Sequence, residues 1–362
     1  KEVLPECTVV LGGCHASFWD ENALRECPSL DIVVRREGEI TFIDLLEKLH
    51  SKSSLKGVQG ITFRKSDGGI ARTEDRPFME NLDDLPFPAF HLFPLGTFRR
   101  VGKIIFPLTT SRGCVYWCDF CTAVRMFGRK YRMRSPKNVV DEIEFLQNKY
   151  GESQFAFYDD AFTINPERVE KICDEIRQRK LAIRWDCEAR VDMVNKNLLQ
   201  KMSAAGCIAV WLGVESGSQM IIEKMHKKIK LDQTRSAFKA AREIGMMTIA
   251  NVVLGFPGET ERTAWETINF IKELNPGDVG FYIATPYPGT PLYELVKQSG
   301  WLKTTDFNHY DTATPTFETP FLSMEKLGEI RYKALQQFYL RPRYVLGMLK
   351  RGGIYGISSV KT

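Results

Sequence analysis

Three cysteines within eight residues are the part of this sequence with the clearest capacity for chemistry. Cys114, Cys118 and Cys121 follow the pattern Cys-x3-Cys-x2-Cys, while the other six cysteines are scattered. Thiolates at this spacing can surround one side of a metal cluster because the residues between them form a tight loop. A structural zinc ion needs four ligands, and His91 and Cys173, the nearest further candidates, are remote in sequence. An iron–sulfur cube on three thiolates leaves one iron open for a substrate or cofactor. Three thiols without a function are the simplest alternative.

The elements that must position this loop alternate regularly from about residue 104. Short apolar runs alternate with segments whose apolar residues recur at helical spacing, such as Val139, Ile143 and Leu146. Parallel strands joined by right-handed helical crossovers produce this alternation. We expect strands at residues 104–110, 154–158, 182–186, 208–213, 247–255 and 280–285, and helices at 136–150, 166–180, 195–205, 231–244, 261–274 and 291–298.

Capping residues mark the ends of these helices. Ser135-Pro136 and Asn165-Pro166 place an N-cap before a proline at the first helical position. Gly206, Gly245 and Gly300 lie just past helix ends, where a left-handed residue is needed. Six β/α units fit an open or closed parallel barrel or a doubly wound sheet, and the pattern does not decide between them. In each case the loops after the strands form the working face, and the cysteine loop follows the first strand.

Residues 1–50 carry a shorter version of the same alternation. Two β/α units cannot close a parallel sheet of their own. Either they pack on the barrel or the preceding strands of a larger α/β domain are missing from this chain, and we favour the second interpretation. A connector with a hairpin around residues 66–69 follows them. We expect strands at residues 7–11 and 31–35, and helices at 20–26, 41–50 and, in the tail, 324–339.

The cysteine segment resembles a known family. Cys114-x3-Cys118-x-Phe120-Cys121, with an aromatic residue before the third cysteine, resembles the signature of radical S-adenosylmethionine (SAM) enzymes. The resemblance covers about residues 104–300 and implies a partial (β/α)6 barrel. It also implies a 4Fe–4S cluster on the three cysteines, whose open iron chelates the amino and carboxylate groups of SAM. One electron from the cluster then cleaves SAM to methionine and a 5′-deoxyadenosyl radical.

The same resemblance gives roles to residues at the ends of the second and fourth strands. Asp159 and Asp160 lie where the family holds the methionine amino group of SAM, and a carboxylate suits an ammonium. Capping of the next turn is the alternative, above all for Asp159. Glu215 and Ser216 lie where polar groups of the family contact the SAM ribose and carboxylate.

Residues after the third and fifth strands complete the expected cofactor-binding set. For Glu188 and Arg190, a mutual structural pair and a role as SAM ligands remain equally open. Gly255 and Pro257 belong to the segment 255–260, which resembles the family's adenine-side loop, where the backbone usually meets the base. A plain turn that starts the next helix is the alternative, because Gly and Pro are turn residues.

The first 50 residues narrow the resemblance. Residues 12–16 and 31–39 resemble the end of the cobalamin-binding domain that precedes the barrel in cobalamin-dependent radical SAM enzymes, and residues 213–218, 255–260 and 338–343 fit that group too. Such enzymes methylate unreactive carbon or phosphorus centres, or rearrange and cyclise rings, as the anaerobic cyclase of chlorophyll synthesis does. The first strands of that domain and a cobalt-ligating Asp-x-His-x-x-Gly are not found here. We therefore expect cobalamin to belong to a full-length parent chain.

These inferences together predict an α/β protein in which a partial (β/α)6 radical SAM barrel follows the C-terminal part of a Rossmann-like cobalamin-binding domain. We expect residues 1–55 to be that remnant, 56–100 a connector, 101–300 the barrel and 301–362 a helical extension. Cobalamin-dependent methylation of an unreactive carbon is the favoured reaction. Radical oxidation or ring cyclisation without methyl transfer, and a non-catalytic iron–sulfur electron carrier or sensor, are the alternatives.

Composition and charge exclude other classes. The 362 residues are 43% hydrophobic and 26% charged, as in globular proteins. The longest nearly uncharged apolar stretch, residues 246–257, is far short of the roughly 20 residues that span a bilayer. The amino terminus has no apolar signal core, and nine cysteines without a secretion signal favour reduced thiols in the cytoplasm.

Charge and the placement of basic residues also bear on the expected binding partners. A net charge of +5 is slight for this length and by itself names no partner. Because few aromatic residues, Phe127 and Tyr131, are interleaved with the basic ones, we expect no nucleic acid. We expect a small-molecule substrate of unknown identity and an electron donor such as flavodoxin or ferredoxin. Basic residues could receive an anionic substrate or that donor, but a solvated face is the favoured interpretation for most of them. These are Arg125, Arg129, Lys130, Arg132 and Arg134 after the cysteine loop, and Lys224, Lys227, Lys228 and Lys230 before the fourth helix.

Overall fold

A six-stranded parallel sheet forms the centre of the protein, for which a computed structural model describes residues 1–95, 105–342, 344 and 345. Spatial order follows chain order, so every crossover steps to the next position in the same direction, as in a barrel and unlike a doubly wound sheet. Among the described residues the first and last strands do not pair with each other, so the barrel is open. Its strands are β5 (Phe106–Leu108), β8 (Gln154–Phe157), β9 (Arg184–Arg190), β10 (Cys207–Glu215), β11 (Met247–Leu254) and β12 (Asp278–Ile283).

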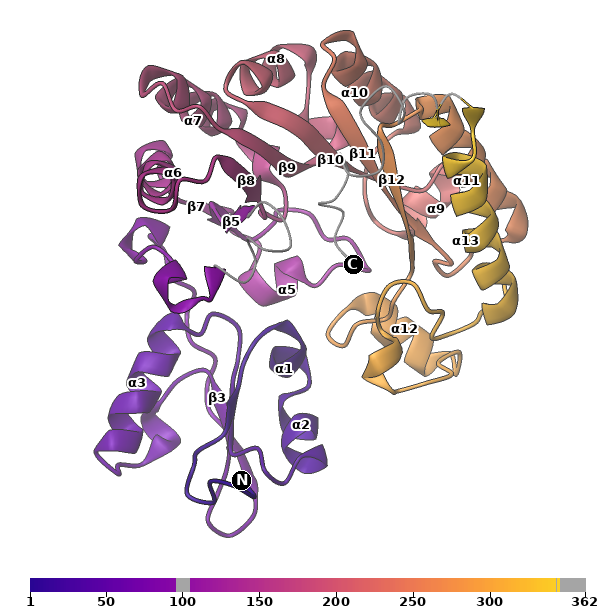
Figure 1. Cartoon of the computed structure of the whole chain (residues 1–362). Coiled ribbons are helices and arrows are strands. Elements are labelled where there is room, and N and C mark those ends of the chain that lie inside the picture. The colour runs from indigo at the N-terminus through magenta and orange to yellow at the C-terminus, as the bar shows by residue number, and fades with distance from the viewer. Residues whose placement is uncertain (96–104, 343, 346–362) are drawn as a thin grey trace.

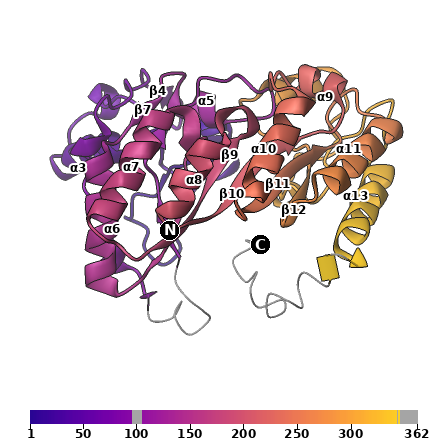
Figure 2. The same ribbon diagram turned by 90° about the horizontal axis from the view of Figure 1, so that it is seen from above.

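Helices cover the outer, convex side of this curved sheet (Figures 1 and 2). The expected caps are present, since the Ser135 hydroxyl accepts from Asn138 N and the Asn165 side chain accepts from Arg168 N. Fully buried Trp185, Phe155 and Phe157 belong to the core between the layers. The helices after the strands are α6 (Pro136–Tyr150), α7 (Pro166–Gln178), α8 (Lys196–Ala204), α9 (Gln219–Lys224), α10 (Leu231–Glu243), α11 (Glu261–Leu274) and α12 (Pro291–Gln298).

The expected barrel and tail elements are all found, apart from what lies outside the described residues. Ile104, which was expected in a strand, and Arg343, which belongs to the terminal segment 338–343, lie outside them. Helix α13 (Met324–Tyr339) matches its expected bounds and packs beside α11 and β12 (Figure 1).

The described residues contain no helix long and apolar enough to cross a membrane. Cytoplasmic location stays a prediction. All nine cysteines have free thiol groups in the structure.

A small two-stranded ribbon closes the cysteine loop. Strand β6 (Ser111–Arg112) pairs antiparallel with β7 (Arg132–Met133), and helix α5 (Ala123–Phe127) lies between them. The loop is tight at Gly113, which has a φ of 88° and where a Cβ would lie 2.4 Å from the Lys130 carbonyl oxygen. Only glycine fits this conformation and this approach.

A smaller α/β unit precedes the barrel. Its mixed four-stranded sheet has the order β1-β2-β3-β4, in which β1 and β2 are parallel and the rest antiparallel. The expected hairpin thus extends the N-terminal sheet across residue 55, where the sequence suggested a boundary. The unit contains β1 (Val10–Leu11), α1 (Cys14–Phe18), α2 (Asp20–Glu26), β2 (Ile32–Val34), α3 (Glu39–His50), β3 (Ile61–Arg64) and β4 (Ile70–Arg72), of which α1 was not expected.

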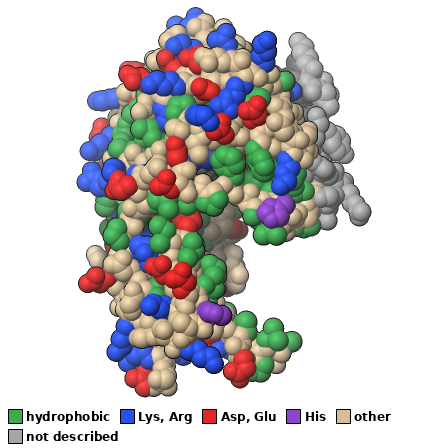
Figure 3. Space-filling model, turned by 90° about the vertical axis from the view of Figure 1, so that its left-hand side faces the viewer, with side chains coloured by type: hydrophobic (Ala, Val, Ile, Leu, Met, Phe, Trp, Pro, Cys, Tyr) green, Lys and Arg blue, Asp and Glu red, His purple; other side chains and the backbone are tan. Residues whose placement is uncertain are grey.

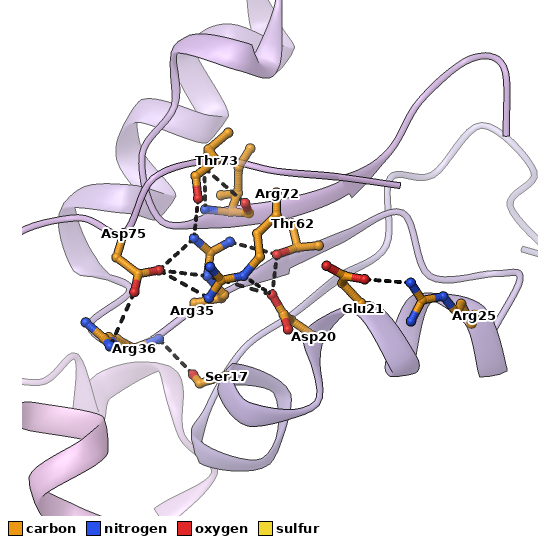
Figure 4. Close-up of polar contacts among 11 residues, drawn as sticks. Ser17, Asp20, Glu21, Arg25, Arg35, Arg36, Thr62, Arg72, Thr73 and Asp75 are labelled. Atoms are coloured by element: carbon orange, nitrogen blue, oxygen red, sulfur yellow. Dashed lines mark hydrogen bonds and ion pairs between the residues drawn. The ribbon is translucent and has the colours of Figure 1, made fainter. Parts of the chain in front are cut away.

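Buried Arg35 ties this unit together (Figure 4). Its guanidinium donates to Thr62 Oγ1 at 2.7 Å, to the Thr73 carbonyl oxygen at 2.6 Å and to Asp75 Oδ1 at 2.8 Å. Asp20 of α2 lies 3.8 Å away. The side chain that directly follows β2 thus links helix α2, strand β3 and the segment after β4, so residues 56–75 fold with residues 1–55.

Short 3-10 helices lie in the connections between the other elements. They are Leu55–Gly57, Leu82–Asp84, Phe90–Leu92, Phe162–Ile164, Val191–Met193 and Phe307–His309.

In Figure 3 the N-terminal unit lies below the barrel, with an indentation between them. Basic and acidic side chains are intermixed over the face shown.

Candidate active site

The cysteine loop begins where β5 ends, and Asp159 holds that beginning in place. The backbone amides of Thr110 and Ser111 donate to Asp159 Oδ1 at 2.6 and 3.0 Å, and the Thr110 hydroxyl donates to Oδ2. Asp159 is only 2% exposed. Both carboxylate oxygens therefore serve the segment that leads to Cys114 rather than the open side of the barrel.

The three thiols of the loop lie in one partly enclosed environment. Burial raises the pKa of Cys114 and Cys118, and raises the pKa of Cys121 to about 12. Cys114 adds to the upward pKa shifts of both Cys118 and Cys121, so the three sulfurs are near one another. Without a bound metal these thiols are protonated at neutral pH, and binding of iron would release their protons.

Two cations face these thiols and oppose that upward shift. Arg190 and Lys227 both lower the pKa of Cys114 and of Cys118, although burial dominates. Arg190 was an expected site residue. Lys227 was expected on a solvated face but is 8% exposed, so that expectation was wrong for it. The sequence gives no sign of this burial, because Lys227 belongs to a group of lysines whose other members, Lys224, Lys228 and Lys230, are exposed.

Glu215 ends β10 in a left-handed conformation and forms an ion pair with Lys227. Its φ is 61°, and Lys227 Nζ lies 2.5 Å from Glu215 Oε1. Gly213 makes room for the pair, because a Cβ there would lie 2.5 Å from that oxygen and 2.8 Å from the Lys227 nitrogen. A strained backbone at a strand end beside a buried charge pair is typical of functional sites.

The sequence suggested Glu188 as a partner of Arg190, whereas the structure shows Arg190 held by residues of three other segments. Its guanidinium bonds to both Asp192 oxygens at 2.9 and 3.0 Å and to the Lys227 carbonyl oxygen at 2.9 Å. It also stacks 3.4 Å from the ring centroid of Tyr116, inside the cysteine loop. Arg190 thereby connects the end of β9 to that loop, and its ion pair is with Asp192.

Asp160 and Glu188 are carboxylates on the open side of the sheet. Desolvation, together with the charges of Asp159 and Glu188, raises the pKa of Asp160 to about 6. Asp160 also adds to the raised pKa of Cys114 and Cys121, which places it beside the thiols. Glu188 is half-buried and also adds to the raised pKa of Tyr282 on β12. These two acids can accept hydrogen bonds from a cation or from hydroxyl groups beside the cysteine loop.

Ser216 lies behind the site. It is fully buried, its hydroxyl lies 3.0 Å from Thr267 Oγ1, and it accepts from Ser218 N. Its side chain anchors the turn after β10 to helix α11.

The loop after β11 is shaped by a glutamate that was not expected in the site. Glu259 is 1% exposed and its Oε2 accepts from Gly255 N, while Oε1 has no partner among the described residues. Burial raises its pKa to about 8. Gly255 has a φ of 84° and Pro257 is buried. The turn residues of this segment predict a loop, but only the structure shows that the carboxyl group of Glu259 lies inside that loop.

The basic run after the cysteines is partly internal, which corrects the expectation of a solvated face. Arg132 and Arg134 are 3% and 8% exposed and form ion pairs with Glu37 and Glu142 at 2.6 and 2.5 Å. Because Glu37 belongs to the N-terminal unit, Arg132 joins that unit to the barrel.

This donor set fits an iron–sulfur cube better than one metal ion. In the part of the chain that the structure describes, no three Cys, His, Asp or Glu side chains converge as ligands of one ion. In a cube each thiolate binds its own iron, so three neighbouring thiols in one loop suffice. Cys114, Cys118 and Cys121 would hold the cluster, and nearby Arg190 and Lys227 would offset its negative charge. Such a cluster supplies the electron that cleaves SAM bound at its open iron.

Comparisons with known proteins agree with this geometry. The radical SAM superfamily matches residues 108–271. An uncharacterised methyltransferase of Pyrococcus horikoshii is 35% identical over 96% of this chain and 75% of its own length. The anaerobic magnesium-protoporphyrin IX monomethyl ester cyclase of Rubrivivax gelatinosus is 28% identical over 97% of this chain and 66% of its own. The chain belongs to the radical SAM superfamily and is an enzyme of that class.

Solved structures give the same fold. The cobalamin-dependent SAM radical enzyme OxsB has a TM-score of 0.75, with 20% identity over 94% of this chain and 55% of its own. The radical SAM methyltransferase TsrM from Kitasatospora setae has a TM-score of 0.70, with 21% identity over 84% and 60%. The chain thus spans little more than half of these two proteins. The expected partial barrel is confirmed.

Proposed function

We propose that this chain is the radical SAM portion of a cobalamin-dependent enzyme that methylates an unreactive carbon. The observation that carries the proposal is the 35% identity to a methyltransferase along nearly the whole chain. It is supported by the cysteine loop beside two acids and two cations. The solved neighbours with the same fold include one described with cobalamin and a 4Fe–4S cluster.

Within this proposal the described residues divide into two groups. Asp160, whose charge acts on the thiols, and Glu188, whose charge acts on Asp160, bind SAM together with the backbone of the 255–257 loop. Asp159 and Ser216 hold loops from behind, as their hydrogen bonds indicate. Arg190 and Glu215 place charged groups at the site, where Arg190 is paired with Asp192 and Glu215 with Lys227. An acidic one-electron carrier such as flavodoxin or ferredoxin supplies the electron.

Product analysis of SAM turnover tests the proposed reaction. The parent protein, loaded with cluster and cobalamin, is given SAM with a deuterated methyl group and a candidate substrate. Methylation through cobalamin predicts equal amounts of 5′-deoxyadenosine and S-adenosylhomocysteine, with the label in the product. One SAM supplies the radical that removes hydrogen, and the other supplies the methyl group. Deoxyadenosine formed without S-adenosylhomocysteine would contradict methylation.

That contradicting result would instead support the second candidate, radical oxidation or ring closure. The similarity to the anaerobic cyclase over 97% of this chain favours it specifically. Both reactions begin with hydrogen removal from the substrate, and they differ in whether a methyl group follows.

A further inference from the structure

We infer that a pocket at the seam between the N-terminal unit and the barrel binds an uncharged, ring-bearing part of the substrate. This inference rests on the proposed function, since it names the class of molecule on which that site would act. The pocket has a volume of about 440 Å³, within the usual range for small-molecule sites. Its walls come from helix α1, from Thr122 before helix α5, and from residues 287–310.

The pocket lies next to the reactive loop. Thr122 directly follows Cys121 and is one of the lining residues. The opposite walls are formed by Cys14 and His15 of the N-terminal unit and by Tyr287 after β12. A molecule held here is therefore in contact with the loop that carries the thiols, which is where radical chemistry requires its substrate.

Aromatic side chains with fixed positions form much of the lining. The rings of His15 and Phe307 meet edge-to-face at a centroid distance of 4.4 Å, and those of Phe307 and Tyr310 lie 4.9 Å apart. The Tyr287 hydroxyl donates to the Tyr310 carbonyl oxygen at 3.1 Å. Rings arranged in this way bind another ring through stacked or edge contacts.

The lining also disfavours charge. None of the residues that line the pocket is Asp, Glu, Lys or Arg. Burial lowers the pKa of His15 and raises the pKa of Tyr310 to about 12, so both side chains are neutral at pH 7. A carboxylate or phosphate entering this space would lose water without gaining a cationic partner. An uncharged ring avoids that cost.

Disulfide tethering at Cys14 tests the inference without turnover. Cys14 lines the pocket, whereas Cys7 and Cys27 are also exposed free thiols but lie outside the lining, so they serve as internal controls. The reconstituted chain is equilibrated, in a thiol buffer, with equal amounts of the disulfides of 2-phenylethanethiol, 2-mercaptoethanol and 3-mercaptopropionate. Peptide mass spectrometry then gives the ratio of phenylethyl to carboxyethyl adduct at each cysteine.

We expect that ratio to be about tenfold higher at Cys14 than at the two controls, as burial of one ring would give. Phe307→Ala should lower it to the control value and Phe307→Leu to an intermediate one. Phe321→Ala, at an exposed phenylalanine outside the pocket, should leave it unchanged. Equal ratios at all three cysteines would overturn the inference. So would protection of Cys14 by hydroxocobalamin without a preference for the ring, because the pocket would then belong to a corrinoid site. Tethering does not need the cluster, so failure of the radical chemistry would leave this result intact.

Discussion

At the scale of single residues, paired charges decide what the candidate site can do. Glu215 and Lys227 are both buried, and their side chains are 7% and 10% exposed. A buried pair gains little over an apolar pair, but removal of one partner leaves an uncompensated charge. The pair thus specifies a local structure next to the thiols more than it stabilises the fold.

Lys227→Met should lower the free energy of unfolding by about 3–5 kcal/mol, because Glu215 would remain buried without a partner. Glu215→Gln in the same chain should recover most of that loss. Urea unfolding measures both changes, and Lys228→Met, at an exposed neighbour, is the control. A Lys227→Met protein as stable as the control would show that the pair is not buried as described.

Glu259 gives the molecule a pH dependence that can be separated from the cluster. Its pKa rises from 4.5 to about 8 on folding because it is buried. The folded state therefore keeps a proton that the unfolded state loses, and stability is fully present below pH 4.5 and falls as the pH rises towards 8. The slope should be about 1.4 kcal/mol per pH unit in that window.

Glu259→Gln should remove this slope, because a neutral amide can still accept from Gly255 N. Chemical unfolding of both proteins from pH 5 to pH 8 measures it. Parallel pH curves for the two proteins would contradict the assignment of the slope to Glu259.

At the scale of elements, the order and approximate ranges of the strands and helices were the part of the structure that the sequence predicted best. All six barrel strands and their helices occur near their expected ranges, because apolar periodicity, Ser135 and Asn165 caps and glycines such as Gly206 mark them. Side-chain partners could not be predicted in the same way. Asp192 pairs with Arg190, and Lys227 with Glu215, through approaches between loops that periodicity does not encode.

Asp159 links strand β8 to the start of the cysteine loop, so its loss should affect cluster binding. Asp159→Ala would leave the Thr110 and Ser111 amides buried without an acceptor, at about 1–3 kcal/mol for each. We expect less iron per chain after reconstitution, and Asp159→Asn should restore part of it. Normal iron content in Asp159→Ala would show that the loop does not depend on this anchor.

Helix α13 supports the loop after β11 by direct packing. A Cβ at Gly255 would lie 2.4 Å from Leu327 Cδ2, and the φ of 84° disfavours any side chain. Gly255→Ala should therefore destabilise the fold through both strain and overpacking. Leu327→Ala should relieve only the overpacking.

A double-mutant cycle of these two changes should show a favourable coupling of about 1–3 kcal/mol. Strict additivity would mean that α13 does not touch the loop.

At the scale of the whole molecule, the N-terminal unit and the barrel form a continuous structure around the cysteine loop. Arg132 joins them through Glu37, and on the other side the rings of His15 in α1 and of Trp19 between α1 and α2 meet the ring of Phe307. The sequence indicated a remnant and a connector, but the shared sheet of residues 10–72 depends on the Arg35 contacts, which no local pattern reveals. The seam between these parts is where the proposed substrate would be selected.

The most direct test of the central claim is electron paramagnetic resonance of the reconstituted, reduced chain with and without SAM. Three thiols in one loop and acids beside them predict a 4Fe–4S signal that shifts when SAM is added, and its loss in Cys118→Ala. A cluster signal unchanged by SAM would contradict an open iron and favour electron transfer. The absence of any cluster, with the wild type equal to Cys118→Ala, would contradict the account as a whole.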